Sequence, residues 1–149
     1  MIGDILAAYD WFDHPEGLRY VETHRDAYRT SGHWLFLPGD ISAFHELSNN
    51  EEFWLIHLGR VLVHVLDPDG VHHVLRLGNN LAAGERPVVT VPGNYWQADE
   101  IPGGTAFAFG TNVCAPAFSY EEWVLADRED LLREFSHHED LIIRLTFPV

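Results

Sequence analysis

Turn signals that divide the chain into short apolar segments constrain its fold more than any other feature of the sequence. The clearest of these turns is Asp67-Pro68-Asp69-Gly70, which separates an apolar segment at 61–66 from another at 71–77. Proline and glycine are residues that a tight turn favours. The sequence therefore predicts a β-hairpin over these two segments.

Further segments of strand length lie on both sides of this hairpin, with turn residues between them. The predicted strands are 20–24, 33–37, 41–47, 52–58, 87–91, 96–98 and 105–109, with 111–114 continuing or following the last one. Residues 79–86 are a predicted loop. Short strands at regular spacing favour an antiparallel sandwich or barrel over a fold that alternates strands with helices.

Helical patterns occur near the two ends of the sequence. Apolar residues at helical spacing predict a short N-terminal helix over 2–12, which ends before Pro15 because the residue preceding a proline avoids helical geometry. Near the C-terminus, Asp127 is a candidate N-cap for a second helix. The apolar face of that helix holds Leu131, Leu132 and Phe135. Residues 141–147 are a predicted final strand.

Composition and charge limit the partners that the protein can have. The chain carries 9 basic and 23 acidic side chains, for a formal charge of −14. Nucleic acids and anionic membranes bind cationic surfaces, so we expect neither as a partner. A hydrophobic content of 46% over 149 residues is enough for one full core. We expect a single domain over residues 1–149.

The single cysteine and the start of the chain bear on the compartment. Cys114 lies in an apolar segment and has no second cysteine to pair with, so we expect a buried, unreactive thiol. The first residues lack the cationic region and apolar core of a signal peptide, and no apolar run approaches the roughly 18 residues of a membrane helix. We therefore expect a soluble cytoplasmic protein.

His45 and Glu52 are the residues whose chemistry most clearly indicates a functional site. They lie on two successive predicted strands, 41–47 and 52–58, joined by a polar loop. Side chains on neighbouring antiparallel strands point to the same side when the registers agree. A histidine and a carboxylate placed in this way can form part of a metal site or an acid–base pair.

The spacing of Gly39, His45, Glu52 and Gly59 resembles the first motif of the cupin superfamily. The order of further segments is similar to one branch, the fifth cupin family, almost from end to end. These segments are His-Pro-Glu-Gly at 14–17, Glu22-Thr23, Pro-Gly…Ser-Ala-Phe-His at 38–45, Leu-Asp-Pro-Asp-Gly at 66–70, Leu-Ala-Ala-Gly-Glu-Arg-Pro at 81–87, Trp96-Gln97 and Cys…Ala-Pro…Phe at 114–118. Their common order makes the resemblance specific.

The resemblance implies an all-β fold, the double-stranded β-helix or jelly roll of the cupins, with a pocket in the mouth of the barrel. Together with the helical patterns, this predicts a cupin jelly roll with a short N-terminal helix and a C-terminal helix. The resemblance also implies a small-molecule ligand or substrate and a homodimer.

The chain departs from the general cupin pattern at two positions of its metal-binding set. Leu47 stands where the first motif has its second histidine, and Gln97 stands where the second motif has its histidine. The closer branch often has a histidine where this chain has Leu55. Of the three histidines and one glutamate that the pattern implies as metal ligands, His45 and Glu52 remain.

Two interpretations of the His45–Glu52 pair stay open. In the first, Gln97 supplies a carbonyl oxygen as a third ligand, and one divalent metal ion is held weakly, because glutamine is a poor ligand for transition metals. In the second, no metal binds, and Gln97 is a polar wall of the pocket. His45 and Glu52 then act as an acid–base pair, because histidine titrates near neutrality beside a carboxylate that fixes its tautomer.

Trp54 and Glu22 are further candidates for contact with the substrate. Trp54 shares a strand face with Glu52, although a place in the hydrophobic core explains it equally well. Glu22 faces the barrel interior if it shares a face with Tyr20, and is a solvated carboxylate otherwise.

The remaining histidines, and Glu16 beside His14, have simpler explanations. His14 and Glu16 lie in a turn, and turn geometry alone explains Pro15 and Gly17 there. Six histidines lack a carboxylate or histidine at ligand spacing, and we expect them at solvated positions or helix ends. They are His57, His64, His72, His73, His137 and His138.

Three functions are consistent with these residues. The first is a small-molecule enzyme of the isomerase, epimerase or lyase type, with His45 as base or ligand, Glu52 as its partner or ligand and Gln97 as a third polar group. The second is a non-catalytic binding or sensing module that uses the same pocket. The third is an iron- or manganese-dependent oxygenase, against which the missing histidines count.

Overall fold

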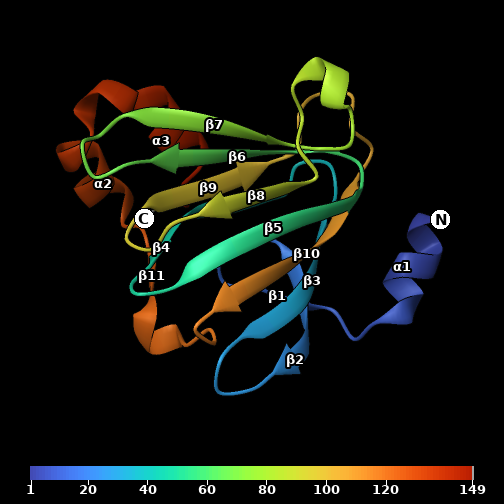
Figure 1. Cartoon of the computed structure of the whole chain (residues 1–149). Coiled ribbons are helices and arrows are strands. Elements are labelled where there is room, and N and C mark those ends of the chain that lie inside the picture. The colour runs from blue at the N-terminus through green and yellow to red at the C-terminus, as the bar shows by residue number, and fades with distance from the viewer. Residues whose placement is uncertain (149) are drawn as a thin grey trace.

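The computed structural model describes residues 1–148, which form two antiparallel β-sheets packed face to face (Figure 1). In order across the first sheet lie β1 (Phe12–Asp13), β2 (Arg19–Arg25), β3 (Thr30–Phe36), β10 (Ala108–Ala115), β5 (Glu51–Leu58) and β8 (Val88–Val91). In order across the second lie β11 (Trp123–Leu125), β4 (Ile41–Leu47), β9 (Trp96–Glu100), β6 (Val61–Leu66) and β7 (His72–Leu77). The predicted all-β jelly roll is confirmed.

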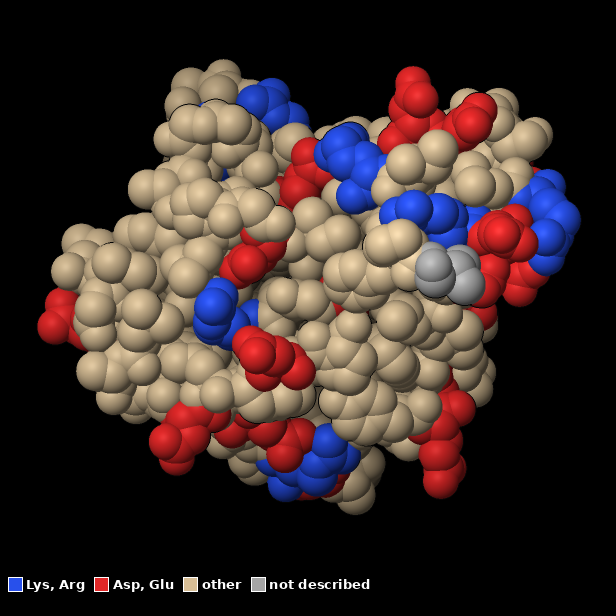
Figure 2. All heavy atoms as spheres, turned by 180° about the vertical axis from the view of Figure 1, so that it is seen from behind, with Lys and Arg blue, Asp and Glu red and all other residues tan. Residues whose placement is uncertain are grey.

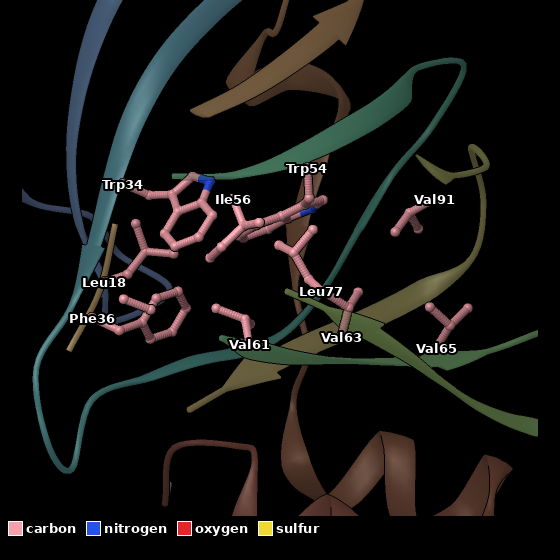
Figure 3. Close-up of a cluster of buried hydrophobic side chains, with 11 residues drawn as sticks. Leu18, Trp34, Phe36, Trp54, Ile56, Val61, Val63, Val65, Leu77 and Val91 are labelled. Atoms are coloured by element: carbon pink, nitrogen blue, oxygen red, sulfur yellow. The ribbon is translucent and has the colours of Figure 1, made fainter. Parts of the chain in front are cut away.

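The space between the sheets holds the main hydrophobic core (Figure 3). Trp34 and Phe36 of β3, and Val61 and Val63 of β6, are at most 1% exposed and belong to this core. Within each pair, one residue separates the two side chains, and alternate side chains of a strand point to one face. The alternation that predicted the strands therefore also fills the core.

Helices near the C-terminus cover the outer face of the five-stranded sheet (Figure 1). These elements are α2 (Arg128–Glu134), the 3-10 helix η3 (Ser136–His138) and α3 (Glu139–Arg144). Leu131 of α2 and Ile142 of α3 pack with Phe44 of β4 in a second hydrophobic core. The Asp127 side chain accepts a hydrogen bond of 3.0 Å from the backbone N–H of Asp130, so the predicted N-cap is confirmed.

The prediction of a strand at 141–147 was wrong, because α3 occupies most of this segment. Leu141, Ile142 and Leu145 have a spacing that also fits one face of a helix. The N–H of Leu145 donates to the carbonyl of Leu141 at 3.0 Å, which is the hydrogen bond of an α-helical turn.

The N-terminal helix α1 (Ile2–Ala8) is shorter than the predicted helix over 2–12. Tyr9 already has an extended backbone, and Phe12 pairs with Tyr20 where β1 meets β2. Ile5 is the buried residue of this helix, so α1 lies against the edge of the domain rather than over its core (Figure 1).

The hairpin of β6 and β7 forms as predicted. Gly70 has a φ of 80°, which favours glycine, and its N–H donates to the Asp67 carbonyl at 2.8 Å. The Asp67 side chain accepts two more hydrogen bonds, from the N–H groups of Asp69 and Val71, each at 2.9 Å. The turn is therefore held by its own residues.

Some short elements were missed or differently bounded in the prediction. The prediction placed strands at 105–109 and 111–114. Residues 108–115 instead form the single strand β10, and residues 105–107 have no strand structure. β1, β11 and the 3-10 helices η1 (Leu81–Ala83) and η2 (Tyr120–Glu122) were not predicted. Among residues 1–148, no helix is long and apolar enough to cross a membrane. The homodimer and the cytoplasmic location stay predictions.

Two adjacent isoleucines test the contribution of the C-terminal helices to stability. Ile142 is fully buried and Ile143 is 44% exposed. We expect Ile142→Ala to lower the free energy of unfolding by about 2–5 kcal/mol, because it leaves a cavity in the second core. The matched control Ile143→Ala should change it by about 0.5 kcal/mol or less. Urea titrations measure both values, and equal losses would contradict the described packing.

Candidate functional site

A cavity of about 250 Å³ lies at one end of the space between the sheets. Its walls come from β2, β3, β4, β5 and β10 and from the segment between β10 and β11. Aromatic side chains dominate these walls, among them Tyr20, Trp34, Trp54, Phe118, Tyr120 and Trp123. Cavities with apolar walls and a few converging polar groups are typical of ligand sites.

A β-bulge in β4 helps to set the direction of His45. Ser42 pairs with Asp99 and His45 pairs with Gln97, so β4 has two residues where β9 has one between these pairs. A bulge of this kind changes which face the following side chain occupies. In a regular strand, side chains three positions apart point to opposite faces. Ser42 and His45 are three positions apart, yet both are buried.

The turn at residues 14–17 is held against β4. The N–H of Ala43 donates to the Glu16 carbonyl at 2.7 Å. Gly17 has a φ of 117°, and a Cβ atom at this position would lie 2.4 Å from the Ile41 carbonyl oxygen. Glycine is therefore required for the close approach, and this approach brings the Glu16 side chain to the cavity.

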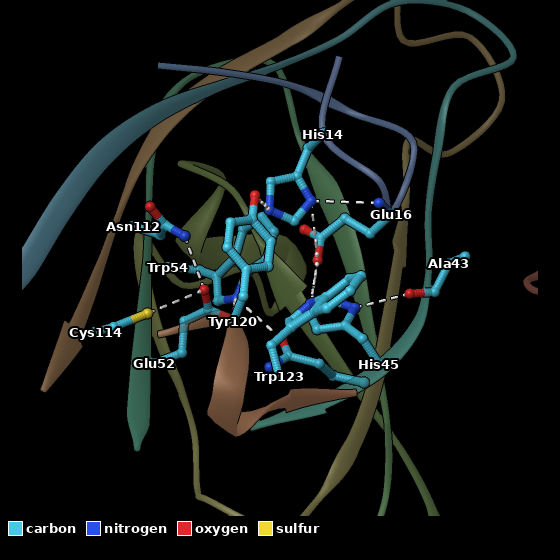
Figure 4. A network of polar contacts seen from close by, with 11 residues as sticks. His14, Glu16, Ala43, His45, Glu52, Trp54, Asn112, Cys114, Tyr120 and Trp123 are labelled. Carbon is cyan, nitrogen blue, oxygen red and sulfur yellow. Dashed lines mark hydrogen bonds and ion pairs between the residues drawn. The ribbon is translucent and has the colours of Figure 1, made fainter. Parts of the chain in front are cut away.

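Glu16 lies between two histidines (Figure 4). Its Oε2 atom is 3.6 Å from His14 Nδ1 and 3.4 Å from His45 Nε2, and it accepts a hydrogen bond of 3.3 Å from Trp123 Nε1–H. Glu16 is 8% exposed and His45 is 2% exposed. The carboxylate is therefore buried in the wall of the cavity, with two imidazoles beside it.

The partners of His45 indicate its tautomer. His45 Nδ1 is 2.7 Å from the Ala43 carbonyl oxygen, which can only accept, so Nδ1 carries the proton. The neutral ring then has a lone pair on Nε2, facing Glu16. Two acceptors make a favourable contact only if a proton lies between them. His45 and Glu16 are therefore placed to share one proton.

His14 has the opposite tautomer. Its Nδ1 accepts a hydrogen bond of 3.3 Å from the backbone N–H of Glu16, so the proton of the neutral ring is on Nε2. That atom is 3.4 Å from the Tyr120 hydroxyl, and the two rings stack with centroids 5.9 Å apart. Tyr120 therefore fixes the orientation of His14.

Glu52 lies across from Glu16 in Figure 4 and is held by neutral donors. Its Oε1 accepts from Trp54 Nε1–H at 3.2 Å, and its Oε2 accepts from Asn112 Nδ2–H at 2.7 Å and from the Cys114 thiol at 3.5 Å. No Arg or Lys side chain of residues 1–148 forms an ion pair with Glu52.

Burial changes the pKa of each of these groups. It raises the pKa of Glu16 and of Glu52, and the neighbouring histidines oppose this only in part. Burial lowers the pKa of His14 and of His45, and the nearby carboxylates oppose this in turn. Both shifts disfavour charge, so the carboxyl and imidazole groups differ less in basicity than they do in water. Proton transfer between such groups is easy.

The other predicted site residues lie at the edge of this arrangement. Glu22 lines the cavity together with Tyr20, but its carboxylate pairs with Arg25 at 2.7 Å. Gln97 does not line the cavity, and its Oε1 accepts from Trp54 Nε1–H at 3.2 Å behind the wall. Trp54 was predicted either to contact the substrate or to belong to the core. It lines the cavity and also belongs to the main core, so the two interpretations do not exclude each other.

The predicted metal ligands His45, Glu52 and Gln97 do not fit a metal ion as their side chains stand. The Glu52 oxygens and Gln97 Oε1 accept N–H or S–H donors, and Gln97 does not line the cavity. His45 alone is oriented as a ligand, because Nδ1 donates to a carbonyl and leaves the Nε2 lone pair available. Within residues 1–148, no group of three or more His, Cys, Asp or Glu side chains is arranged to hold a metal.

Sequence reasoning missed several residues of the cavity. His14 and Glu16 were assigned to turn geometry alone, although the His-Pro-Glu-Gly resemblance pointed to them. Asn112 lies in a strand without any charged neighbour to mark it, and Tyr120 and Trp123 follow the last long strand. Only the folded chain brings these side chains to His45.

The solvated position predicted for His64 was wrong. His64 is 5% exposed, its Nδ1 is 3.0 Å from His72 Nε2, and its Nε2 is 3.5 Å from a Glu100 oxygen. His137 and His138 lie in η3, and each has its Nε2 within hydrogen-bond distance of the Gly70 carbonyl. Strand register places His64 beside the edge strand β7, which spacing along the sequence does not reveal.

Asp99 is a second unexpected feature, located on β9 and fully buried. Neither of its carboxyl oxygens has a hydrogen-bond partner among residues 1–148, and the hydroxyl of its pairing partner Ser42 has none either. Burial raises the pKa of Asp99 well above its usual value, and the carboxylates of Glu16 and Glu52 raise it further. Burial therefore favours the neutral form of Asp99.

Comparison with known proteins supports the fold over the whole chain. Residues 3–126 match the model of a family described as Cupin superfamily (DUF985). A crystal structure from Shewanella oneidensis has 25% sequence identity and a TM-score of 0.91, with 98% of each chain covered. A hypothetical protein from Leishmania major has 22% identity and a TM-score of 0.90, covering 99% of this chain and 98% of the other.

A more distant structure carries a functional description. Pac13 from Streptomyces, described as a unique nucleoside dehydratase, has 13% identity and a TM-score of 0.59. The match covers 78% of this chain and 83% of Pac13, and at this identity it shows a shared fold. No curated protein matches the sequence significantly.

The burial of Asp99 predicts a change of stability with pH. The folded state keeps Asp99 protonated above the pH at which the unfolded chain ionises, so this residue makes the protein less stable as pH rises. We expect Asp99→Asn to become more stable relative to the wild type as pH rises from about 4 to 8. The difference in the free energy of unfolding should grow by up to about 1.4 kcal/mol per pH unit between the unfolded-state and folded-state pKa of Asp99.

Chemical denaturation of both proteins across this pH range measures the difference. Asp69→Asn, at an exposed turn position, is the matched control, and its difference from the wild type should stay constant. Parallel curves for Asp99→Asn and the wild type would show that Asp99 is not held neutral.

Proposed function

The chain belongs to the cupin superfamily (DUF985), and from this premise we propose that it is a small-molecule enzyme of the isomerase, epimerase or lyase type. Such enzymes move a proton to and from carbon. The observation that carries the proposal is the buried Glu16 carboxylate held between His14 and His45 in the wall of the cavity. No Arg side chain of residues 1–148 forms an ion pair with this carboxylate, so it is free to act as a base.

Removal of a proton from the substrate is the first step. A C–H bond next to a carbonyl group loses its proton to a Glu16 oxygen, and the electron pair moves onto the carbonyl oxygen to form an enolate. As one Glu16 oxygen accepts the substrate proton, the proton that Glu16 shares with His45 moves onto His45, so the pair then holds two protons. The extra proton leaves to solvent after turnover, and this restores the base. General base catalysis of this kind contributes about 10²–10⁴-fold to a rate.

Glu52 is the proton donor on the other side of the cavity. Burial raises the pKa of Glu52 as it does that of Glu16. Glu16 stands beside two histidines that can hold its proton, whereas within residues 1–148 Glu52 accepts hydrogen bonds only from Asn112, Trp54 and Cys114, so Glu52 is the carboxyl group that keeps a proton to donate. Return of a proton from Glu52 to carbon gives an epimer or isomer, and donation to a leaving hydroxyl gives loss of water. The hydrogen bonds from Asn112 and Trp54 keep this carboxyl group in place for either outcome.

Two further observations support the proposal. The aromatic walls limit the access of water, which strengthens electrostatic interactions with the substrate. The fold is shared with Pac13, whose description as a dehydratase denotes loss of water, a reaction of the lyase type. His45 and Glu52 stay in the proposed site, but their roles differ from the predicted ones. The role of base passes from His45 to Glu16, and Glu52 is a separate proton donor rather than the partner of His45.

Exchange of carbon-bound hydrogen with solvent tests this chemistry without knowledge of the natural substrate. In D₂O, a panel of ketoses, uronates, 2-oxo acids and amino ketones is incubated with the protein and followed by proton NMR. We expect deuterium to appear next to the carbonyl group of one class. His45→Gln and Glu16→Gln should each slow this exchange by about 100-fold or more.

His64→Gln is the matched control, because it removes a buried histidine outside the cavity. Its exchange rate should equal that of the wild type, with circular dichroism confirming that each variant folds. Binding of a panel compound without any exchange would contradict the enzyme and support the alternative, a binding or sensing module.

The engaged donor atoms predict the effect of metal removal. Because the Glu52 and Gln97 oxygens accept hydrogen bonds from neighbouring donors, we expect dialysis against a chelator to leave the exchange rate unchanged. A loss of exchange that manganese, iron or zinc restores would instead support the weak metal site proposed for His45, Glu52 and Gln97.

A further inference from the structure

We propose that the cavity binds an organic cation, a small molecule whose positive charge lies on an ammonium group, in preference to neutral or anionic ligands. This names the substrate class of the proposed function and rests on the same cavity. The inference comes from three features of the cavity, namely its charges, the arrangement of its aromatic rings and the polar atoms that have no partner.

The charged residues of the cavity wall are Glu16, Glu22, Glu52 and Arg25. Arg25 donates to a Glu22 oxygen at 3.0 and 2.7 Å and to the Phe118 carbonyl at 2.8 Å, so these two side chains neutralise each other at the exposed rim. The deeper carboxylates, Glu16 and Glu52, then face neutral donors and two histidines whose burial favours the neutral form. The interior therefore has negative charge at the ionised Glu16, and no Arg side chain of residues 1–148 forms an ion pair with it.

Aromatic rings gather next to Glu16. Tyr120 packs edge to face with Phe118, at 83° with centroids 4.9 Å apart, and with Trp123, at 88° with centroids 5.6 Å apart. All three line the cavity, and the electron-rich faces of such rings attract ammonium groups. Trp123 also donates to Glu16, so the carboxylate lies beside these rings (Figure 4).

Two polar atoms of cavity-lining residues have no hydrogen-bond partner within residues 1–148. They are the Trp34 Nε1–H donor and the Asn112 Oδ1 acceptor. An unpaired buried polar group is costly. Both atoms are closed to solvent, so a ligand with one donor and one acceptor pairs with them only where side chains of the wall shift to expose them.

The charge of the whole molecule favours the same ligands. All nine basic residues are arginines, and the formal charge is −14. Figure 2 shows arginines beside acidic side chains on one face of the molecule rather than gathered in a basic patch. Ion pairs such as Arg60–Glu85 and Arg144–Glu100 engage them locally. The field outside the cavity therefore attracts cations and repels carboxylates and phosphates.

Anionic and neutral ligands fit this cavity less well. An anion would lie close to Glu16 and Glu52 with no basic side chain to compensate it, and repulsion of this kind is strong away from water. A neutral ligand would displace water from the carboxylates without replacing its stabilisation of their charge. An ammonium group does replace it.

Matched probes that differ only in charge test the proposal. Choline is compared with its uncharged isostere, in which carbon replaces the nitrogen, and with the carboxylate of the same carbon skeleton. Butylammonium, butanol and butyrate form a second set of primary-amine size. The indole N–H signals of ¹⁵N-labelled protein report binding, because Trp54 and Trp123 donate to the two buried carboxylates.

In at least one set we expect the cation to bind about tenfold more tightly than its neutral partner, and the anion to bind most weakly. Glu16→Gln should remove most of this preference. Glu46→Gln is the matched control, since it makes the same change in net charge at a position of β4 outside the cavity. Glu52→Gln gives a second variant should Glu16→Gln fail to fold.

Equal or tighter binding of the neutral partners in both sets would overturn the proposal. An absence of indole shifts with both cations, up to the solubility of the probes, would overturn it as well. Neither result would affect the proposed acid–base chemistry, because deuterium exchange into a neutral ketose could still be observed. Tight binding of the cation without deuterium exchange into any panel compound would instead contradict the proposed enzyme. The proposal that the cavity binds organic cations would then remain supported.

Discussion

The alternation of side chains along antiparallel strands is the constraint on which both the core and the cavity depend. On β5, Glu52, Trp54 and Ile56 all point between the sheets; the first two line the cavity and the third belongs to the core. The interior changes along this strand from polar to apolar. A site built on a sheet in this way is rigid, and a small cavity needs such rigidity to hold acid and base groups in place.

Much of the fold could be predicted because alternation and turn residues act locally. The hairpin at 61–77 needed only its own residues, and His45, Glu52 and Trp54 followed from strand faces. The assignment of 141–147 failed because Leu141, Ile142 and Leu145 fit either a strand or a helix. Packing against Phe44 decides between the two, and this contact joins segments about a hundred residues apart in the sequence.

The central role of Glu16 could not be derived from local rules for a similar reason. Proline and glycine at 15 and 17 do indicate a turn, but the turn becomes part of the cavity only where Gly17 meets the Ile41 carbonyl. This close approach depends on tertiary structure. Residues assigned to turn geometry alone can therefore carry chemistry when the turn is held against a strand, as the hydrogen bond from Ala43 holds this one.

The cavity and the C-terminal helices occupy opposite faces of the five-stranded sheet. Trp123 is the last residue in sequence that lines the cavity, and the match to the family model ends shortly afterwards, at residue 126. The helices that follow pack on the outer side through Leu131 and Ile142. The sheet thus separates the second core from the cavity. Substitutions behind it change the stability of the protein without altering the cavity wall, whereas the space in front of it holds both the main core and the cavity.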